Sequence, residues 1–278
     1  MININLGLQP ISNRFLYKPV KNPKSYKMNL IWNEQLDCMS LSKTFPVKEL
    51  KPQFEWITCF EPEDHLDELA LFISKLNNIN KTSVIGAFSF KDDTTLNRLN
   101  KMGFINTWRI DPELDLKIRD KICSVETFQS KFSRKISSTI LYNKGKADIF
   151  IARHVIEHAY DIFEFVMTSQ SLVKDDGYIV FELPDCERGM LEGDCTILWE
   201  EHLNYFTETS FKNFIEGLGF EIVFWNNYNY PLENSITVIL KNNSLKVDYL
   251  KNKNDTIEQQ NIFTTFKEKM YDRKSKIY

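Results

Sequence analysis

The sequence predicts an α/β fold: a Rossmann-like, mainly parallel sheet with helices on both faces. From residue 82 onward, short apolar runs with strand character alternate with amphipathic helical segments, a pattern typical of parallel sheets. Two β-rich runs with no helix between them close this region, so an antiparallel hairpin should complete the sheet. The chain has 278 residues, 42% of them hydrophobic and 13% aromatic, and can therefore bury a large core.

The first 61 residues differ from the rest of the chain. Five of the nine prolines fall there, and apolar periodicity is weak. This combination predicts an irregular N-terminal extension with a short strand at residues 28–32. Residues 62–245 are expected to form the main domain and residues 246–278 a helical tail.

The main domain should begin with a helix over residues 62–78. Pro62 suits a first helical turn, and the apolar residues recurring at helical spacing are Leu66, Leu69, Ile73 and Leu76. The next expected elements are a strand at 83–88, a helix after Asp92 or Asp93, a strand at 104–110, a charged helix at 113–120, a strand near 121–125, a helix at 128–142, a strand at 148–152, a helix at 160–173, a turn at 176–177 and a strand at 178–183. A helix at 210–217 and strands at 220–225 and 235–240 follow. A polar helix at 255–273 should bury Ile257, Ile262, Phe263 and Phe266.

Composition excludes several classes of protein. The net charge of −3 lacks the basic footprint of a nucleic-acid binder. The five cysteines form no CxxC pair, which argues against a zinc knuckle or a disulfide framework. Unpaired thiols fit a reducing cytoplasm, where we expect the protein to be. We find neither a signal peptide nor a run of about 20 apolar residues that could span a membrane.

Ligands of parallel sheets bind at the carboxyl ends of the strands, so the residues that follow each strand are the first candidates. Asp111 closes the second strand, where it could accept hydrogen bonds from a ribose or simply cap the next turn. The first strand is followed by Gly86 and the letters AFSFKDD. This loop matches neither G-x-G-x-x-G nor a P-loop, although a helix N-terminus remains available at residues 92–95.

Three of the four histidines fall between residues 152 and 206. His154, Glu157 and His158 spell H-x-x-E-H, but they follow a strand directly instead of lying on a helix, so we expect no metal there. His202 follows two glutamates, and a carboxylate can hold an imidazole ready for proton transfer. Trp199 offers a ring surface nearby. A solvated surface histidine is the alternative.

Five segments carry a resemblance to a known family. They are LGLQPISNRF (6–15), RIDPE (109–113), ARHVIEH (152–158), IVFELPD (179–185) and TILWEEHLNYF (196–206). With these motifs the run from 83 to 240 resembles class I S-adenosylmethionine-dependent methyltransferases. More closely, it is similar to the sugar C-methyltransferases that modify nucleotide-linked deoxyhexoses. The resemblance implies an enzyme of polysaccharide or glycan-precursor biosynthesis that uses S-adenosylmethionine.

The resemblance also implies roles for individual residues. The cofactor-binding set comprises Gly86, Ala87, Ser89 and Asp92 around the amino-acid part and sulfonium, Asp111 and Pro112 at the ribose, Thr127 and Phe128 near the adenine, and Arg153, His154 and His158 beneath the cofactor. His202, paired with Glu201, would be the general base that deprotonates the acceptor. The substrate-binding set comprises Trp56, Asp185, Trp199, Glu200 and Tyr205.

The chain departs from this family in ways that leave a second function open. The family holds zinc through four N-terminal cysteines, of which only Cys38 is present here, so we expect no metal. The first loop is poor in glycine, and the family's C-terminal domain is not found. A non-catalytic relative that binds a sugar nucleotide or a partner enzyme is therefore the alternative. The expected ligand is a small molecule, and the assembly could be a homodimer or a complex with a partner enzyme.

Overall fold

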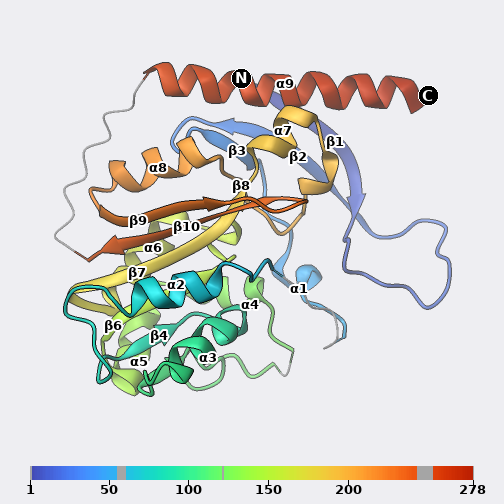
Figure 1. The fold of residues 1–278 in the computed structure, drawn as a ribbon. Coiled ribbons are helices and arrows are strands. Elements are labelled where there is room, and N and C mark those ends of the chain that lie inside the picture. Colours follow the sequence, from blue (N-terminus) through green and yellow to red (C-terminus); the bar gives the residue numbers. More distant parts are fainter. Residues whose placement is uncertain (1, 55–60, 121, 243–252, 278) are drawn as a thin grey trace.

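The computed structural model describes residues 2–54, 61–120, 122–242 and 253–277. These residues form a six-stranded sheet, order β5-β4-β6-β7-β10-β9, and a four-stranded sheet, order β1-β2-β3-β8 (Figure 1). In the larger sheet β5, β4, β6 and β7 are parallel, and β10 runs antiparallel between β7 and β9. The predicted α/β fold, with its parallel sheet and closing hairpin, is confirmed.

The strands of the larger sheet are β4 (Ile85–Ala87), β5 (Thr107–Arg109), β6 (Ala147–Arg153), β7 (Val173–Asp185), β9 (Glu221–Tyr228) and β10 (Asn234–Lys241). Alternate side chains of β6 face opposite layers. Ile149 and Ile151 pack with the helices α2 (Leu66–Ile73) and α3 (Asp93–Lys101). Phe150 and Ala152 pack with α5 (Arg134–Lys144), α6 (Ile162–Ser171) and α8 (Glu208–Gly217). Both faces of the sheet are thus covered, as parallel sheets require.

The N-terminal segment is more regular than its prolines predict. It forms β1 (Asn3–Pro10), β2 (Ser25–Asn33) and β3 (Cys38–Leu41), and β3 pairs antiparallel with β8 (Asn204–Tyr205). Alternate residues of β2 are buried from residue 28 to residue 32, which explains why a strand was visible there. Pro10 is tolerated because β1 is an edge strand and Pro10 is its last residue.

The long helix α9 (Lys253–Ile277) lies across the smaller sheet, at the end of the molecule opposite α3 and α5 (Figure 1). Its Phe263 stacks on Trp32 of β2, with ring centroids 6.5 Å apart. Ile262 and Phe266 are buried as predicted, whereas Ile257 is 56% exposed and does not belong to the apolar stripe. No helix among the described residues is long and apolar enough to cross a membrane.

Three predictions between the second and fifth strands are wrong. Residues 112–116 form turns instead of a charged helix, because the Asp111 carboxylate accepts the backbone N–H groups of Glu113 and Leu114. Residues 122–124 are not a strand, and Ser124 caps the short helix α4 (Val125–Gln129), which is separate from α5. The expected turn at Asp176 lies inside β7, where that residue adopts a φ of +63°.

The remaining short elements are α1 (Val47–Leu50), η1 (Phe90–Asp92), η2 (Ile156–His158), α7 (Glu187–Glu192) and η3 (Cys195–Ile197). Three of them follow strands of the larger sheet directly: η1 follows β4, η2 follows β6, and α7 follows β7. They place side chains at the carboxyl edge of that sheet. The segment between η3 and β8 approaches this edge from the smaller sheet, since the backbone N–H of Leu203 donates to the carbonyl of Glu157.

Candidate active site

A cavity of about 950 Å³ lies at the carboxyl edge of the parallel strands. This volume is within the range of small-molecule sites. Its walls include Phe90 and Lys91 after β4, residues 122–126, His154 and His158 after β6, Trp199, Glu201 and His202 before β8, the β9–β10 turn from Tyr230 to Glu233, and Asn13, Phe54 and Glu61 from the N-terminal part. The two sheets therefore enclose the cavity together.

Lys91, Glu61 and His154 form a charged group on one wall. The Nζ of Lys91 lies 2.5 Å from Oε1 of Glu61, and Nδ1 of His154 lies 3.6 Å from Oε2. Burial alone would raise the pKa of Glu61, but the charges of His154 and Lys91 outweigh it and hold this pKa at about 2. His154 has a φ of +48°, which turns the chain sharply after β6. Its Nε2 lies 2.8 Å from Oε1 of Glu182.

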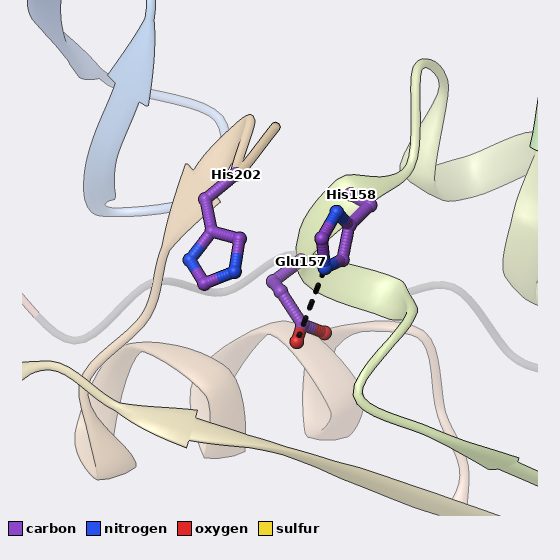
Figure 2. Close-up of side chains that lie close together, drawn as sticks. All are labelled: Glu157, His158 and His202. Atoms are coloured by element: carbon purple, nitrogen blue, oxygen red, sulfur yellow. Dashed lines mark ion pairs between the residues drawn. The ribbon is translucent and has the colours of Figure 1, made fainter. Parts of the chain in front are cut away.

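A second group consists of Glu157, His158 and His202 (Figure 2). The rings of His158 and His202 meet edge to face with centroids 4.7 Å apart, and Nε2 of His158 lies 3.7 Å from Oε1 of Glu157. Burial, reinforced by the charge of His158, lowers the pKa of His202 well below its usual value. Burial opposes protonation of His158 too, but the Glu126 and Glu157 carboxylates raise its pKa. The two imidazoles thus favour opposite protonation states.

Hydrogen bonds from buried residues outside the cavity wall fix the segment that carries His202. The Tyr205 hydroxyl donates to the carbonyl of Trp199 at 2.8 Å, and Glu200 accepts from the backbone N–H and hydroxyl of Ser12 at 2.7 and 2.8 Å. Glu200 and Tyr205 are both buried and do not line the cavity. They hold Trp199, which is 38% exposed and does line it.

Glu201 faces the cavity beside His202. Its Oε1 accepts from Nδ2 of Asn13 at 3.0 Å. Burial and the nearby charge of Glu126 raise its pKa to about 7. Among the described contacts none joins Glu201 to His202, so the predicted pairing of the two side chains is not seen as a hydrogen bond.

Five of the predicted site residues line the cavity: His154, His158, Trp199, Glu201 and His202. The first loop contributes differently from the prediction. Gly86 serves the packing of Trp108, because a Cβ there would lie 2.4 Å from the indole ring. Ala87, Ser89 and Asp92 are fully buried, and the last two form a capping box at the start of η1. These residues shape the loop without reaching the cavity.

The other predicted residues that the structure describes also lie outside the cavity wall. Asp111 and Pro112 form the turn after β5, Phe128 is in the core, and Thr127 contacts Ser124 in the first turn of α4. Asp185 accepts from Asn227 and from the N–H of Glu187. Arg153 is buried against Glu182. Trp56 lies outside the described residues. Binding roles for these residues stay predictions.

Several residues of the cavity wall were missed. Lys91 belongs to the first loop, and Glu126 precedes two residues that were chosen. Glu61 and Glu233 were not predicted as site residues. Glu233 lies in the wall with a pKa that burial raises to about 7. A charged residue just after a predicted strand was the signal available for Lys91; the other three come together only through the tertiary fold.

Comparison with known proteins shows the family of the chain. A family model described as a methyltransferase domain matches residues 31–223. No curated protein matches the chain. Among solved structures, magnesium protoporphyrin IX methyltransferase from Synechocystis PCC 6803, with bound S-adenosylhomocysteine, is 13% identical. The match covers 66% of this chain and 83% of that one, with a TM-score of 0.44.

Two further solved structures match to a similar extent. The 1,6-didemethyltoxoflavin N1-methyltransferase of Burkholderia thailandensis is 8% identical over 66% of this chain and 80% of that one, with a TM-score of 0.42. An S-adenosylmethionine-dependent methyltransferase of Clostridium acetobutylicum is 9% identical over 66% and 93%, also at 0.42. The family model spans well over half of the sequence, so this chain belongs to the methyltransferase domain family and is an S-adenosylmethionine-dependent methyltransferase.

Proposed function

We propose that the protein methylates a small hydroxylated acceptor, a sugar nucleotide or a related glycan precursor, with His202 as the general base. The observation that carries this proposal is the position of His202. Its side chain lines the cavity, and its buried Nδ1 has no hydrogen-bond partner in the part of the chain that the structure describes. An imidazole nitrogen without a partner can accept a proton once a small rotation of the ring brings it to a bound molecule.

The cavity suits the cofactor. S-adenosylmethionine carries a positive sulfonium, and the wall contains the carboxylates of Glu61, Glu63, Asp64 and Glu126. Negative groups within a few ångströms stabilise such a cation. The cavity lies at the carboxyl ends of β4 and β6, where ligands of parallel sheets bind. Lys91, Ser124 and His154 lie on that side and would hold the cofactor.

The chain's own residues would then act on the acceptor. When bound, the cofactor supplies an electrophilic methyl group whose departure leaves a neutral thioether. His202 would take the proton of the acceptor hydroxyl or carbon acid at Nδ1, and the electron pair left on the acceptor forms the new bond to the methyl carbon. Trp199 offers a ring surface against which a sugar can pack. The choice of a sugar nucleotide as the acceptor is supported by the five sequence motifs and by the Trp199 ring.

The first experiment separates binding from turnover. Calorimetry with S-adenosylhomocysteine measures cofactor binding, and transfer of a radiolabelled methyl group from S-adenosylmethionine to a panel of nucleoside diphosphate sugars measures activity. His202→Gln should lower kcat by about 10²- to 10⁴-fold, the contribution of a general base, while cofactor affinity stays within a factor of about two.

Two outcomes would contradict the proposal. Full turnover by His202→Gln would assign proton removal to another group. Methylation of other small molecules, but of no sugar nucleotide, would remove the acceptor class and leave methyl transfer itself untouched. Free nucleoside diphosphates serve as the control for binding through the nucleotide alone.

A further inference from the structure

Three potential metal ligands meet beside the cavity, on elements distant in sequence. Glu157 and His158 belong to η2, and His202 belongs to the segment before β8. One ligand atom from each lies within 4.8 Å of the other two. Figure 2 shows the His202 ring approaching the His158 ring and the Glu157 carboxylate from the opposite side. The backbone bond from Leu203 to Glu157 fixes the two segments against each other.

Each of these three side chains has a buried polar atom for which no hydrogen-bond partner is found among the described residues. These atoms are Oε2 of Glu157, Nε2 of His158 and Nδ1 of His202. Glu157 and His158 are 2% and 5% exposed. Buried polar atoms in native proteins nearly always have a partner, so Nε2 of His158, which has none among the described residues and lies 3.7 Å from Oε1 of Glu157, indicates a missing one. A single cation among the three side chains would bind this nitrogen, the Glu157 carboxylate and Nε2 of His202, which faces them in Figure 2.

Glu126, which is not one of these three residues, also supports a cation at this point. Nδ1 of His158 lies 3.0 Å from Oε1 of Glu126 on α4. Histidines that ligate a metal through one ring nitrogen usually present the other to a carboxylate, which fixes the orientation of the ring. Glu126 is itself buried, at 3% exposed, so it cannot turn away into solvent. With Nδ1 facing Glu126, Nε2 is the nitrogen left for an ion.

We propose that Glu157, His158 and His202 bind a divalent transition metal, with Zn²⁺ as the favoured ion. Two imidazoles and one carboxylate are typical ligands of Zn²⁺ and of related ions, whereas Mg²⁺ and Ca²⁺ prefer oxygen ligands alone. Because His158 and His202 line the cavity, the ion would keep an open position toward a small molecule there. The site differs from the four-cysteine zinc site that the family resemblance implies.

The metal site does not depend on the proposed role of His202 as a base, but the two are mutually exclusive. An ion bound at Nε2 leaves the proton of the neutral imidazole on Nδ1, which then cannot accept another. If His202 is the base, saturating Zn²⁺ inhibits methyl transfer and a chelator restores it. If Zn²⁺ raises turnover instead, the base assignment fails while the metal site stands. Binding is therefore measured first, without cofactor or acceptor.

The test uses the full chain after treatment with a chelator. Titration calorimetry with Zn²⁺ should show one saturable site per chain. Co²⁺ should give visible d–d bands without a thiolate charge-transfer band, which separates this site from the free cysteines. Glu157→Gln and His158→Gln should each weaken Zn²⁺ binding at least about 100-fold. Glu126→Gln, which only orients His158, should weaken it by about 10- to 100-fold.

Glu201→Gln is the matched control. Glu201 lies beside the site and forms an alternative group with Glu126 and His158. The proposal expects this variant to bind Zn²⁺ like the wild type, and loss of binding here with retention in Glu157→Gln would overturn the ligand set. Absence of saturable binding at micromolar Zn²⁺ would overturn the site. Anomalous diffraction at the zinc edge places the ion in the wild type, so the result does not depend on any variant folding.

Discussion

Arg153 and Glu182 form an ion pair beneath the cavity, at the paired ends of β6 and β7. Nε of Arg153 lies 2.8 Å from Oε2, and Nη2 lies 3.0 Å from Oε1. The two side chains are 1% and 0% exposed. The same carboxylate also contacts His154 at 2.8 Å and His65 at 3.1 Å. The buried Glu182 carboxylate thus connects Arg153, His154 and His65 at the carboxyl edge of the parallel sheet, next to the cavity.

Arg153→Met should destabilise the protein strongly. The substitution leaves the Glu182 carboxylate buried without its main partner, and breaking a buried pair in this way costs about 3–5 kcal/mol. Urea unfolding measures the change. Arg134→Met is the control: Arg134 pairs with Glu164 at 2.9 Å but is 64% exposed, and such pairs contribute about 0.2–1 kcal/mol. Equal losses in the two variants would contradict a structural role for the buried pair.

The same carboxylate makes stability depend on pH in the acid range. Burial would raise the pKa of Glu182, but Arg153 and His154 outweigh it and hold this pKa well below 4.5. A carboxyl with a lowered folded pKa stabilises the protein above its unfolded pKa, and this contribution disappears as pH falls through the folded value. The stability difference between wild type and Glu182→Gln should therefore shrink as pH falls from 6 to 3. A difference that is constant over this range would contradict the lowered pKa.

Local pattern was sufficient to predict most of the larger sheet. Residues 149–152 of β6 are a continuous apolar run, and α6 buries Ile162, Phe165, Val166 and Ser169 at helical spacing. Its start is also set locally, since Asp161 accepts the N–H of Glu164 as a cap. Where a short polar side chain competed for backbone groups, the pattern failed. Asp111 turned an expected helix into a turn in this way.

The site itself was only partly predictable. His154, His158 and His202 were chosen because they are ionisable and follow strands or acidic residues, and all three line the cavity. Their partners could not be found in the same way. Glu126 meets His158 from the short helix α4, at a position between the strand and the helix that were expected, and Glu61 meets His154 from outside the sheet. These contacts arise from tertiary packing, which carries no local sequence signal.

Gly86→Ala should destabilise the fold through Trp108. The added Cβ would lie 2.4 Å from Cζ2 of the indole, so the ring or the strand must move. Overpacking of this kind costs about 1–3 kcal/mol. In a Trp108→Leu background the same glycine substitution should cost much less, and a double-mutant cycle measured by chemical denaturation gives the coupling. Additive effects would show that Gly86 is required for another reason.

Tyr205→Phe tests whether the smaller sheet positions Trp199, the residue proposed to contact the acceptor. The Tyr205 hydroxyl bonds to the backbone carbonyl and N–H of Trp199 at 2.8 and 3.2 Å. Losing it should cost about 0.5–1.5 kcal/mol of stability and loosen Trp199. On the proposed function, KM for the acceptor should then rise severalfold while kcat and cofactor affinity change little. Steady-state kinetics in the acceptor measures this split.

Tyr178→Phe is the matched control for this experiment. Its hydroxyl also donates to a backbone carbonyl, that of Asn77 at 3.1 Å, but at the opposite end of β7 from the cavity. Both variants lose one hydroxyl and should lose comparable stability. Only Tyr205→Phe should change KM, because only its hydroxyl holds a residue of the cavity wall. An equal rise of KM in both variants would trace the effect to general destabilisation and remove the positioning role from Tyr205.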